Sequence, residues 1–211
     1  AAPVSPLLDK QFDSVAQHDR DGVWDGTRDV AYTLTVTNPS RTTALRYSLS
    51  DTPELPAGWV INAGSARGTD GSSAIAGLAS DWRGGTTAIV SGRELAAGGS
   101  DTYTVLINVS VPTTATSLEC NGNPGHGLFN RAVLSSGADT FTADACGDLP
   151  RAIPPILAKT VTGNQQNADG TWAITYDLAV TNPDTWLATR YDLSDVLDFG
   201  RGITVRSAGA S

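Results

Sequence analysis

Residues 32–39 have the sequence YTLTVTNP, in which polar and apolar side chains alternate up to an asparagine and a proline. This alternation is typical of a β-strand with one buried face. Residues 101–111, DTYTVLINVSV, alternate in the same way, and further β-rich runs occupy 128–134 and 139–143. Several short strands separated by Gly, Asp and Pro predict an all-β fold, a two-sheet antiparallel sandwich.

The opening segment occurs twice in the chain. Residues 176–183 are YDLAVTNP, and RYSLSD at 46–51 recurs at the same offset as RYDLSD at 190–195. A repeat of about 145 residues has the size of a domain and not of a solenoid unit. We therefore expect a complete domain at 1–148, a Pro-rich linker at 149–155, and the N-terminal part of a second, homologous domain at 156–211. This second domain is expected to be truncated, without several of its strands.

Composition excludes some classes of function. The 211 residues carry a formal net charge of −8, and the sequence pI is about 4.5. Such an acidic chain has no electrostatic reason to bind nucleic acid or an anionic membrane. No apolar run approaches the ~20 residues that a membrane helix requires. No metal-ligand spacing, nucleotide-binding loop or catalytic-serine motif occurs, so we expect no metal, no cofactor and no enzymatic turnover.

The chain has two cysteines, Cys120 and Cys146. In an acidic chain rich in Thr, Ser and Gly, without a metal-ligand pattern, such a pair favours one disulfide and therefore a secreted protein. The alternative is two buried free thiols in a cytosolic domain.

Lysine is rare in this sequence. Among the 14 basic residues only Lys10 and Lys159 are lysines, and both follow a short apolar segment at the start of a repeat. Arginine cannot deprotonate at usable pH, so only a lysine could act as an amine nucleophile. The alternative is that two solvated lysines remain at similar places by common descent.

Four features taken together resemble a known group of domains. A lysine in the first strand is followed by the YTLTVTN strand, by a strand ending at Asp51 before a Pro-rich turn, and by a late LFNRAV strand. This pattern is similar to that of repeat domains of Gram-positive surface adhesins and pilus subunits, the DUF11-like and isopeptide-forming immunoglobulin-like modules. The resemblance covers the first repeat and the first third of the second. It implies tandem immunoglobulin-like β-sandwich domains.

The resemblance also implies a chemistry. In these domains a lysine of the first strand forms an amide bond with an asparagine of the last, which corresponds to Lys10 and Asn130 here, with Asp51 as the assisting acid. Glu94 and Asp29 are alternative acids. The lysine must be buried enough to lose its proton, and the acid buried enough to keep one. Folding itself would bring the groups into contact.

Each of these residues also has a simpler interpretation. An aspartate before Thr-Pro is a common turn former, and the recurrence of Asp51 as Asp195 fits either role. Asn130 could be a buried, hydrogen-bonded polar residue, although a polar side chain in an apolar strand is costly without a purpose. In the second repeat, Lys159 and Asp195 are the equivalents of Lys10 and Asp51.

The resemblance implies a structural or adhesive segment of a bacterial cell-surface protein, either anchored to the cell wall or secreted. Its partners would be neighbouring domains of the same protein and a ligand on a host or another cell. The alternative function is a carbohydrate- or protein-binding sandwich without a cross-link.

Overall fold

The computed structural model describes residues 4–21, 23–71, 73–112, 114–151, 153–184 and 189–210, with the side chains of 23 and 24 left out. The chain divides into two compact units, Ala1–Ala152 and Ile153–Ser211. This division lies within the predicted linker, whose residue 152 is outside the described residues. Each unit is considered by itself.

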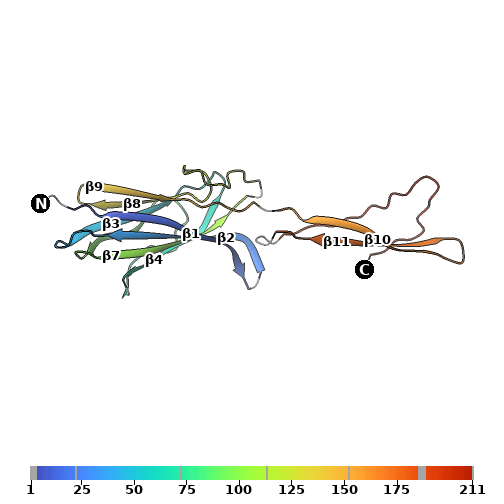
Figure 1. Ribbon diagram of the computed structural model, residues 1–211, viewed down its shortest axis with the longest axis horizontal. Helices are drawn as coiled ribbons and strands as arrows, with labels where there is room; N and C mark the ends of the chain where they lie inside the picture. The colour runs from blue at the N-terminus through green and yellow to red at the C-terminus, as the bar shows by residue number, and fades with distance from the viewer. Residues whose placement is uncertain are drawn as a thin grey trace. The chain divides into compact units, whose positions relative to one another are not determined.

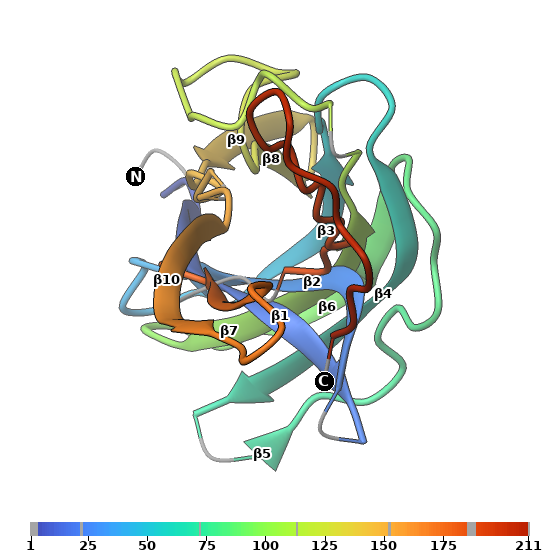
Figure 2. The ribbon, with the colours of Figure 1, turned by 90° about the vertical axis from the view of Figure 1, so that its right-hand side faces the viewer.

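The first unit consists of two antiparallel sheets (Figure 1). The larger sheet has the order β1-β2-β7-β4-β5, and the smaller has the order β6-β3-β8-β9. Figure 2 shows β8 and β9 on one side of the core, with β1, β2 and β7 on the other. The larger sheet contains β1 (Leu7–Arg20), β2 (Val23–Thr37), β7 (Ser100–Ser110), β4 (Val60–Asp70) and β5 (Ser73–Ala74). The smaller contains β6 (Thr87–Leu95), β3 (Leu45–Pro53), β8 (Asn130–Ser136) and β9 (Asp139–Ala145). The predicted all-β sandwich is confirmed.

The alternating segments supply the core between the sheets. Inward side chains of β2 and β7 are buried, while the threonines between them lie on the outer face. Because β2 and β7 pair in register from Thr27↔Ser110 to Thr37↔Ser100, their inward residues form one continuous apolar surface. The residues of this surface are Val30, Tyr32, Leu34, Val36, Tyr103, Val105, Ile107 and Val109.

Asn38, near the end of the segment 32–39, caps the turn with its side chain. Its amide donates hydrogen bonds to the carbonyl oxygens of Thr43, Leu95 and Ala96, and its Oδ1 accepts one from the backbone N–H of Ser40. These bonds hold the turn after β2 against the end of β6, which explains a buried asparagine at this place.

The second unit repeats the first hairpin. Its strands are β10 (Ile156–Gln166) and β11 (Trp172–Thr181). Lys159 pairs with Leu178 as Lys10 pairs with Leu34, and a bulge follows Val161 as one follows Phe12. No strand is assigned among the described residues beyond Thr181. Many apolar side chains of this unit are exposed, among them Ile156, Leu157, Val161, Trp172, Val196 and Ile203. Throughout the described ranges, no helix has the length and apolar character to cross a membrane.

Candidate functional site

Three strands bring together a lysine, an aspartate and an asparagine that are distant in sequence. Lys10 lies on β1 of the larger sheet, and Asp51 and Asn130 lie on the paired strands β3 and β8 of the smaller. Because Asp51 faces Ala132 and Asn130 faces Pro53 in the β3–β8 register, the two polar side chains are diagonal neighbours on the inner face. Lys10 approaches them from the opposite sheet.

The three side chains form one buried cluster with Asp51 in the middle. Lys10 Nζ hydrogen-bonds to Asp51 Oδ1, and Asn130 Nδ2 donates to Asp51 Oδ2 at 2.9 Å. Asp51 and Asn130 are 0% exposed and Lys10 is 6% exposed. Asn130 Oδ1 is buried and accepts no hydrogen bond from the described residues.

Burial moves both ionisable groups toward their neutral forms. It lowers the pKa of Lys10, and this effect outweighs the attraction of the Asp51 carboxylate. It also raises the pKa of Asp51, against the opposing effects of Lys10 and Asn130. The ion pair and the neutral amine–acid pair differ only in the position of one proton. Desolvation favours the neutral pair, which is the reactive combination for attack on an amide.

Two aromatic rings line the cluster. The ring centroid of Tyr32 lies 5.2 Å from Lys10 Nζ, and Phe12 meets Tyr32 edge-on with 5.8 Å between centroids. The Tyr32 hydroxyl donates to the backbone carbonyl of Leu128 at 2.8 Å. Burial raises the pKa of Tyr32 well above its usual value, so the hydroxyl remains a donor.

The two alternative acids lie elsewhere. Glu94 forms an exposed ion pair with Arg46 at 3.5 Å between Oε2 and Nη2. Asp29 is hydrogen-bonded to His18, with 2.7 Å between Oδ2 and Nδ1. Among described residues, neither acid has a hydrogen bond or ion pair with Lys10 or Asn130. Asp51 is therefore the acid that the fold places between them.

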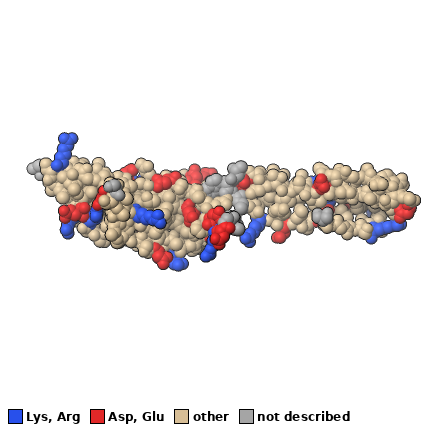
Figure 3. Space-filling model, turned by 90° about the horizontal axis from the view of Figure 1, so that it is seen from below, with Lys and Arg blue, Asp and Glu red and all other residues tan. Residues whose placement is uncertain are grey.

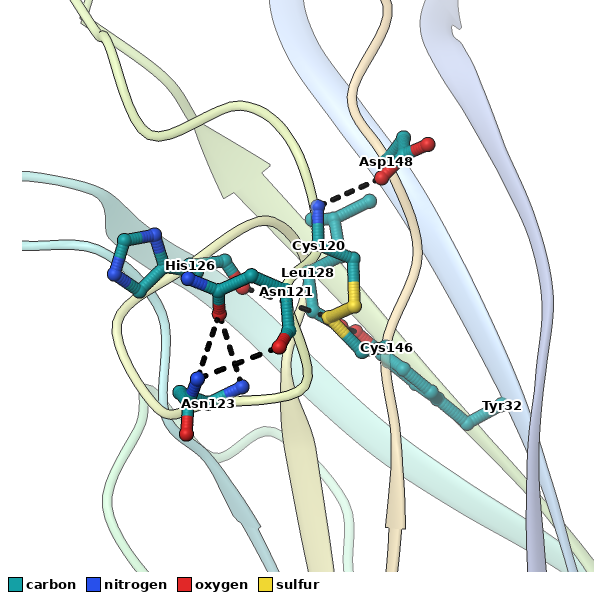
Figure 4. The surroundings of a disulfide bond; sticks show 8 residues. All are labelled: Tyr32, Cys120, Asn121, Asn123, His126, Leu128, Cys146 and Asp148. Carbon is teal, nitrogen blue, oxygen red and sulfur yellow. Dashed lines mark hydrogen bonds between the residues drawn. A yellow bond between two sulfur atoms is a disulfide. The ribbon is translucent and has the colours of Figure 1, made fainter.

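A disulfide joins Cys120 to Cys146 beside the strand that carries the asparagine (Figure 4). Cys146 follows Ala145, which faces Asn130 in the β8–β9 register. The Cys120 N–H donates to Asp148 Oδ1 at 2.7 Å. The loop that precedes β8 is thus fixed to the segment that follows β9.

The second unit contains a similar but more open pair. Lys159 Nζ lies 2.6 Å from Asp195 Oδ1 and 4.6 Å from the ring centroid of Tyr176. The side chains of Lys159 and Asp195 are 33% and 35% exposed, against 0% for Lys10 and Asp51. Within the described part of this unit, no asparagine hydrogen-bonds to Asp195.

The sequence reasoning missed a second buried polar cluster in the first unit. Asp101 is 0% exposed and accepts hydrogen bonds from Tyr47 at 2.6 Å and from Arg93 Nε at 3.0 Å. The hydroxyls of Tyr47 and Tyr103 are also hydrogen-bonded. The available signal was the alternation of β7, which puts Asp101 on the same inward face as Tyr103.

Charged residues are sparse on the face drawn in Figure 3, where uncharged residues make up most of the visible surface. Some arginines pair with nearby acids, as Arg131 does with Asp144 at 2.8 Å.

Comparisons with known proteins gave similarities in structure only. No protein-family model matches the chain, and no curated protein matches it. The pilus backbone protein RrgB of Streptococcus pneumoniae is 11% identical with a TM-score of 0.38, over 87% of this chain and 48% of that one. The major pilin subunit BcpA of Bacillus cereus is 8% identical with a TM-score of 0.35, over 85% of this chain and 54% of that one.

A third match is ACE19, the collagen binding subdomain of the Enterococcus faecalis surface protein ACE, at 8% identity and a TM-score of 0.27. It covers 67% of this chain and 96% of that one. The chain spans about half the length of the RrgB and BcpA structures. Similarities at these identities and TM-scores do not assign a family or a function.

Proposed function

We propose that the first unit forms an amide bond between Lys10 and Asn130, assisted by Asp51, and acts as a tension-resistant segment of a bacterial surface protein. The observation that carries this proposal is the buried contact of all three groups around one carboxyl. A buried lysine–aspartate pair is a poor device for stability alone, because desolvation offsets most of its attraction. An asparagine hydrogen-bonded to the same carboxyl gives the pair a reaction partner.

The reaction balances without any added reagent. The Lys10 proton passes to Asp51, and the neutral Nζ attacks Cγ of Asn130 to form a C–N bond. Asp51 hydrogen-bonds to the amide oxygen and then delivers its proton to Nδ2. The Cγ–Nδ2 bond breaks and ammonia leaves. Asp51 then takes up the surplus proton of the new amide nitrogen, which keeps one hydrogen. The chain reacts once and is its own substrate, so it is not a turnover enzyme.

The Asp51 carboxyl can reach both the amide oxygen and the amide nitrogen of Asn130. In the structure Nδ2 faces Asp51 and Oδ1 has no described partner. A half-turn about the Cβ–Cγ bond exchanges the two atoms and lets a protonated Asp51 donate to Oδ1. This rotation gives Oδ1 a donor, while Nδ2 gives up its hydrogen bond to Asp51.

The cross-link would join β1 directly to β8. Force that enters at the N-terminal end would then cross from Lys10 to Asn130 without unfolding the strands between them. The disulfide supports an oxidising, extracellular location at the cell surface, wall-anchored or secreted. Neighbouring domains of the same protein, and a ligand on a host or another cell, are the proposed partners.

Intact mass under reducing conditions tests the proposal. The wild-type chain should weigh one ammonia less than its sequence, and Lys10→Ala or Asn130→Ala should restore the calculated mass. Lys159→Ala is the matched control and should retain the loss of one ammonia, because no described asparagine is bonded to the Lys159–Asp195 pair. A wild-type mass equal to the calculated one would refute the cross-link and leave a binding sandwich without one.

A further inference from the structure

We infer that Tyr32 is a positioning residue for this amide bond, because its hydroxyl fixes the start of the asparagine strand while its ring lies against the lysine. The inference rests on the proposed function. It assigns to a core tyrosine a role in setting the distance between Nζ and the asparagine side chain.

Tyr32 lies on the strand next to the one that carries Lys10. It lies on β2 opposite Phe12 and two positions from Leu34, the residue that faces Lys10. Its ring therefore reaches Lys10 from the neighbouring strand, 5.2 Å from Nζ. Its hydroxyl crosses to the smaller sheet and donates at 2.8 Å to the carbonyl of Leu128, two residues before Asn130. One side chain thus contacts both reacting segments.

A closed set of contacts surrounds that hydroxyl. The Leu128 N–H donates to the Gly147 carbonyl at 2.8 Å. A Cβ at Gly147 would overlap the ring of Phe12, so this glycine lets the aromatic ring pack directly on the backbone. Phe12 in turn packs edge-on against Tyr32. Figure 4 shows Tyr32 and Leu128 beside the disulfide that closes this region.

The second unit repeats half of the arrangement. Tyr176 faces Val161 as Tyr32 faces Phe12, and its ring centroid lies 4.6 Å from Lys159 Nζ. A tyrosine against the lysine therefore accompanies the lysine in both units. The first unit adds the bond from its hydroxyl to the asparagine segment, and the geometry at Lys10 depends on that bond.

The experiment starts from unfolded, unlinked full-length chain purified in guanidinium chloride, in which the calculated mass is confirmed. Dilution into an oxidising buffer starts folding, and samples quenched in acid are weighed over time. Only molecules with a closed disulfide are counted, so that chains that fail to fold do not enter the rate. Tyr32→Phe keeps the ring and removes the hydroxyl, and we expect linking about tenfold slower, as one lost positioning hydrogen bond implies.

Tyr103→Phe is the matched control. It removes a hydroxyl that is equally buried and hydrogen-bonded in the same core, but bonded to Tyr47 and not to the asparagine segment. Both substitutions are also made in the Asn130→Ala chain, where their effects on unfolding are compared without any cross-link. A slower rate for Tyr32→Phe alone, at matched loss of stability, supports positioning.

The pH profile separates the ring from the hydroxyl. Tyr32→Leu also removes the ring face that favours the ammonium form, so its rate profile should shift to lower pH, whereas the profile of Tyr32→Phe should keep its midpoint. Equal half-times for wild type and Tyr32→Phe, or equal slowing by Tyr103→Phe, would overturn this inference alone. A wild-type chain that never loses ammonia would overturn the proposed function and this inference with it.

Discussion

Asp51 has to serve as partner of a lysine and of an amide at the same time. Its carboxyl accepts from Lys10 on one oxygen and from Asn130 on the other. A side chain in this place controls both the stability of the unlinked fold and its reactivity. The two effects can be measured separately.

Replacing Asp51 by alanine should abolish the loss of ammonia and leave Lys10 buried without its counter-charge. A buried pair broken in this way costs about 3–5 kcal/mol of folding free energy. Intact mass reports the reaction, and denaturant unfolding compared with the unlinked Asn130→Ala chain reports stability. Asp195→Ala, at the equivalent place in the second unit, is the control and should leave the first unit linked. Full linking in Asp51→Ala would exclude the aspartate as the assisting acid.

The rate of linking should have a bell-shaped dependence on pH. In the reactive state the lysine amine is neutral and the shared proton is on Asp51. Burial favours this state, because it lowers the pKa of Lys10 and raises the pKa of Asp51. At low pH both groups are protonated, and the rate rises with pH as the ammonium loses its proton. At high pH the last proton leaves the carboxyl and the rate falls. Refolding from guanidinium chloride at a series of pH values, followed by intact mass, measures the profile. A rate that still rises at alkaline pH would mean that no acid takes part.

At the scale of strands, the sequence predicted the regular parts well. The alternation at 101–111 became β7 (Ser100–Ser110), and the run at 139–143 became β9 (Asp139–Ala145), because one buried face imposes a period of two. The segment YTLTVTNP and its second copy YDLAVTNP end in the same Asx turn. Asn38 Oδ1 accepts from the backbone N–H of Ser40, and Asn182 Oδ1 accepts from that of Asp184. Short-range chemistry of this kind is visible in one segment.

Contacts between strands that are distant in sequence were harder to predict. Lys10, Asp51 and Asn130 were named from a resemblance, since no local pattern indicates that residues 41 and 79 positions apart share one carboxyl. The bond from Tyr32 to Leu128 and the Asp101 cluster were missed for the same reason. They depend on the stacking of two sheets, which alternation alone does not specify.

Gly147 provides a test at the level of packing between elements. Gly147→Ala places a methyl group into the ring of Phe12 and should destabilise the first unit by about 1–3 kcal/mol, the usual cost of overpacking. Adding Phe12→Leu should recover part of this loss, because the smaller side chain leaves room for the methyl group. Denaturant unfolding of the two single variants and the double variant measures the coupling. Strictly additive losses would show that the ring and the glycine do not pack as described.

For the whole molecule, the proposed bond changes how the first unit responds to a pull on its ends. Asn130→Ala should unfold in a single-molecule experiment with an extension on the order of 400 Å, at about 3.5 Å per residue. In the linked chain, residues 11–129 lie inside a covalent ring, so the extension should fall to tens of ångströms at the same ~3.5 Å per residue. The same long step in both chains would contradict a role in resisting tension.

The ring has a further consequence for a chain exposed to proteases. Between β5 and β6 the backbone from 75 to 86 has no assigned strand, and many of its side chains are exposed. A cut there would divide an ordinary domain into two fragments that separate on unfolding. With Lys10 joined to Asn130, the amide would still connect the two fragments, because Lys10 precedes the cut and Asn130 follows it. A single cleavage would then leave the protein in one piece, attached at both ends to whatever it had connected.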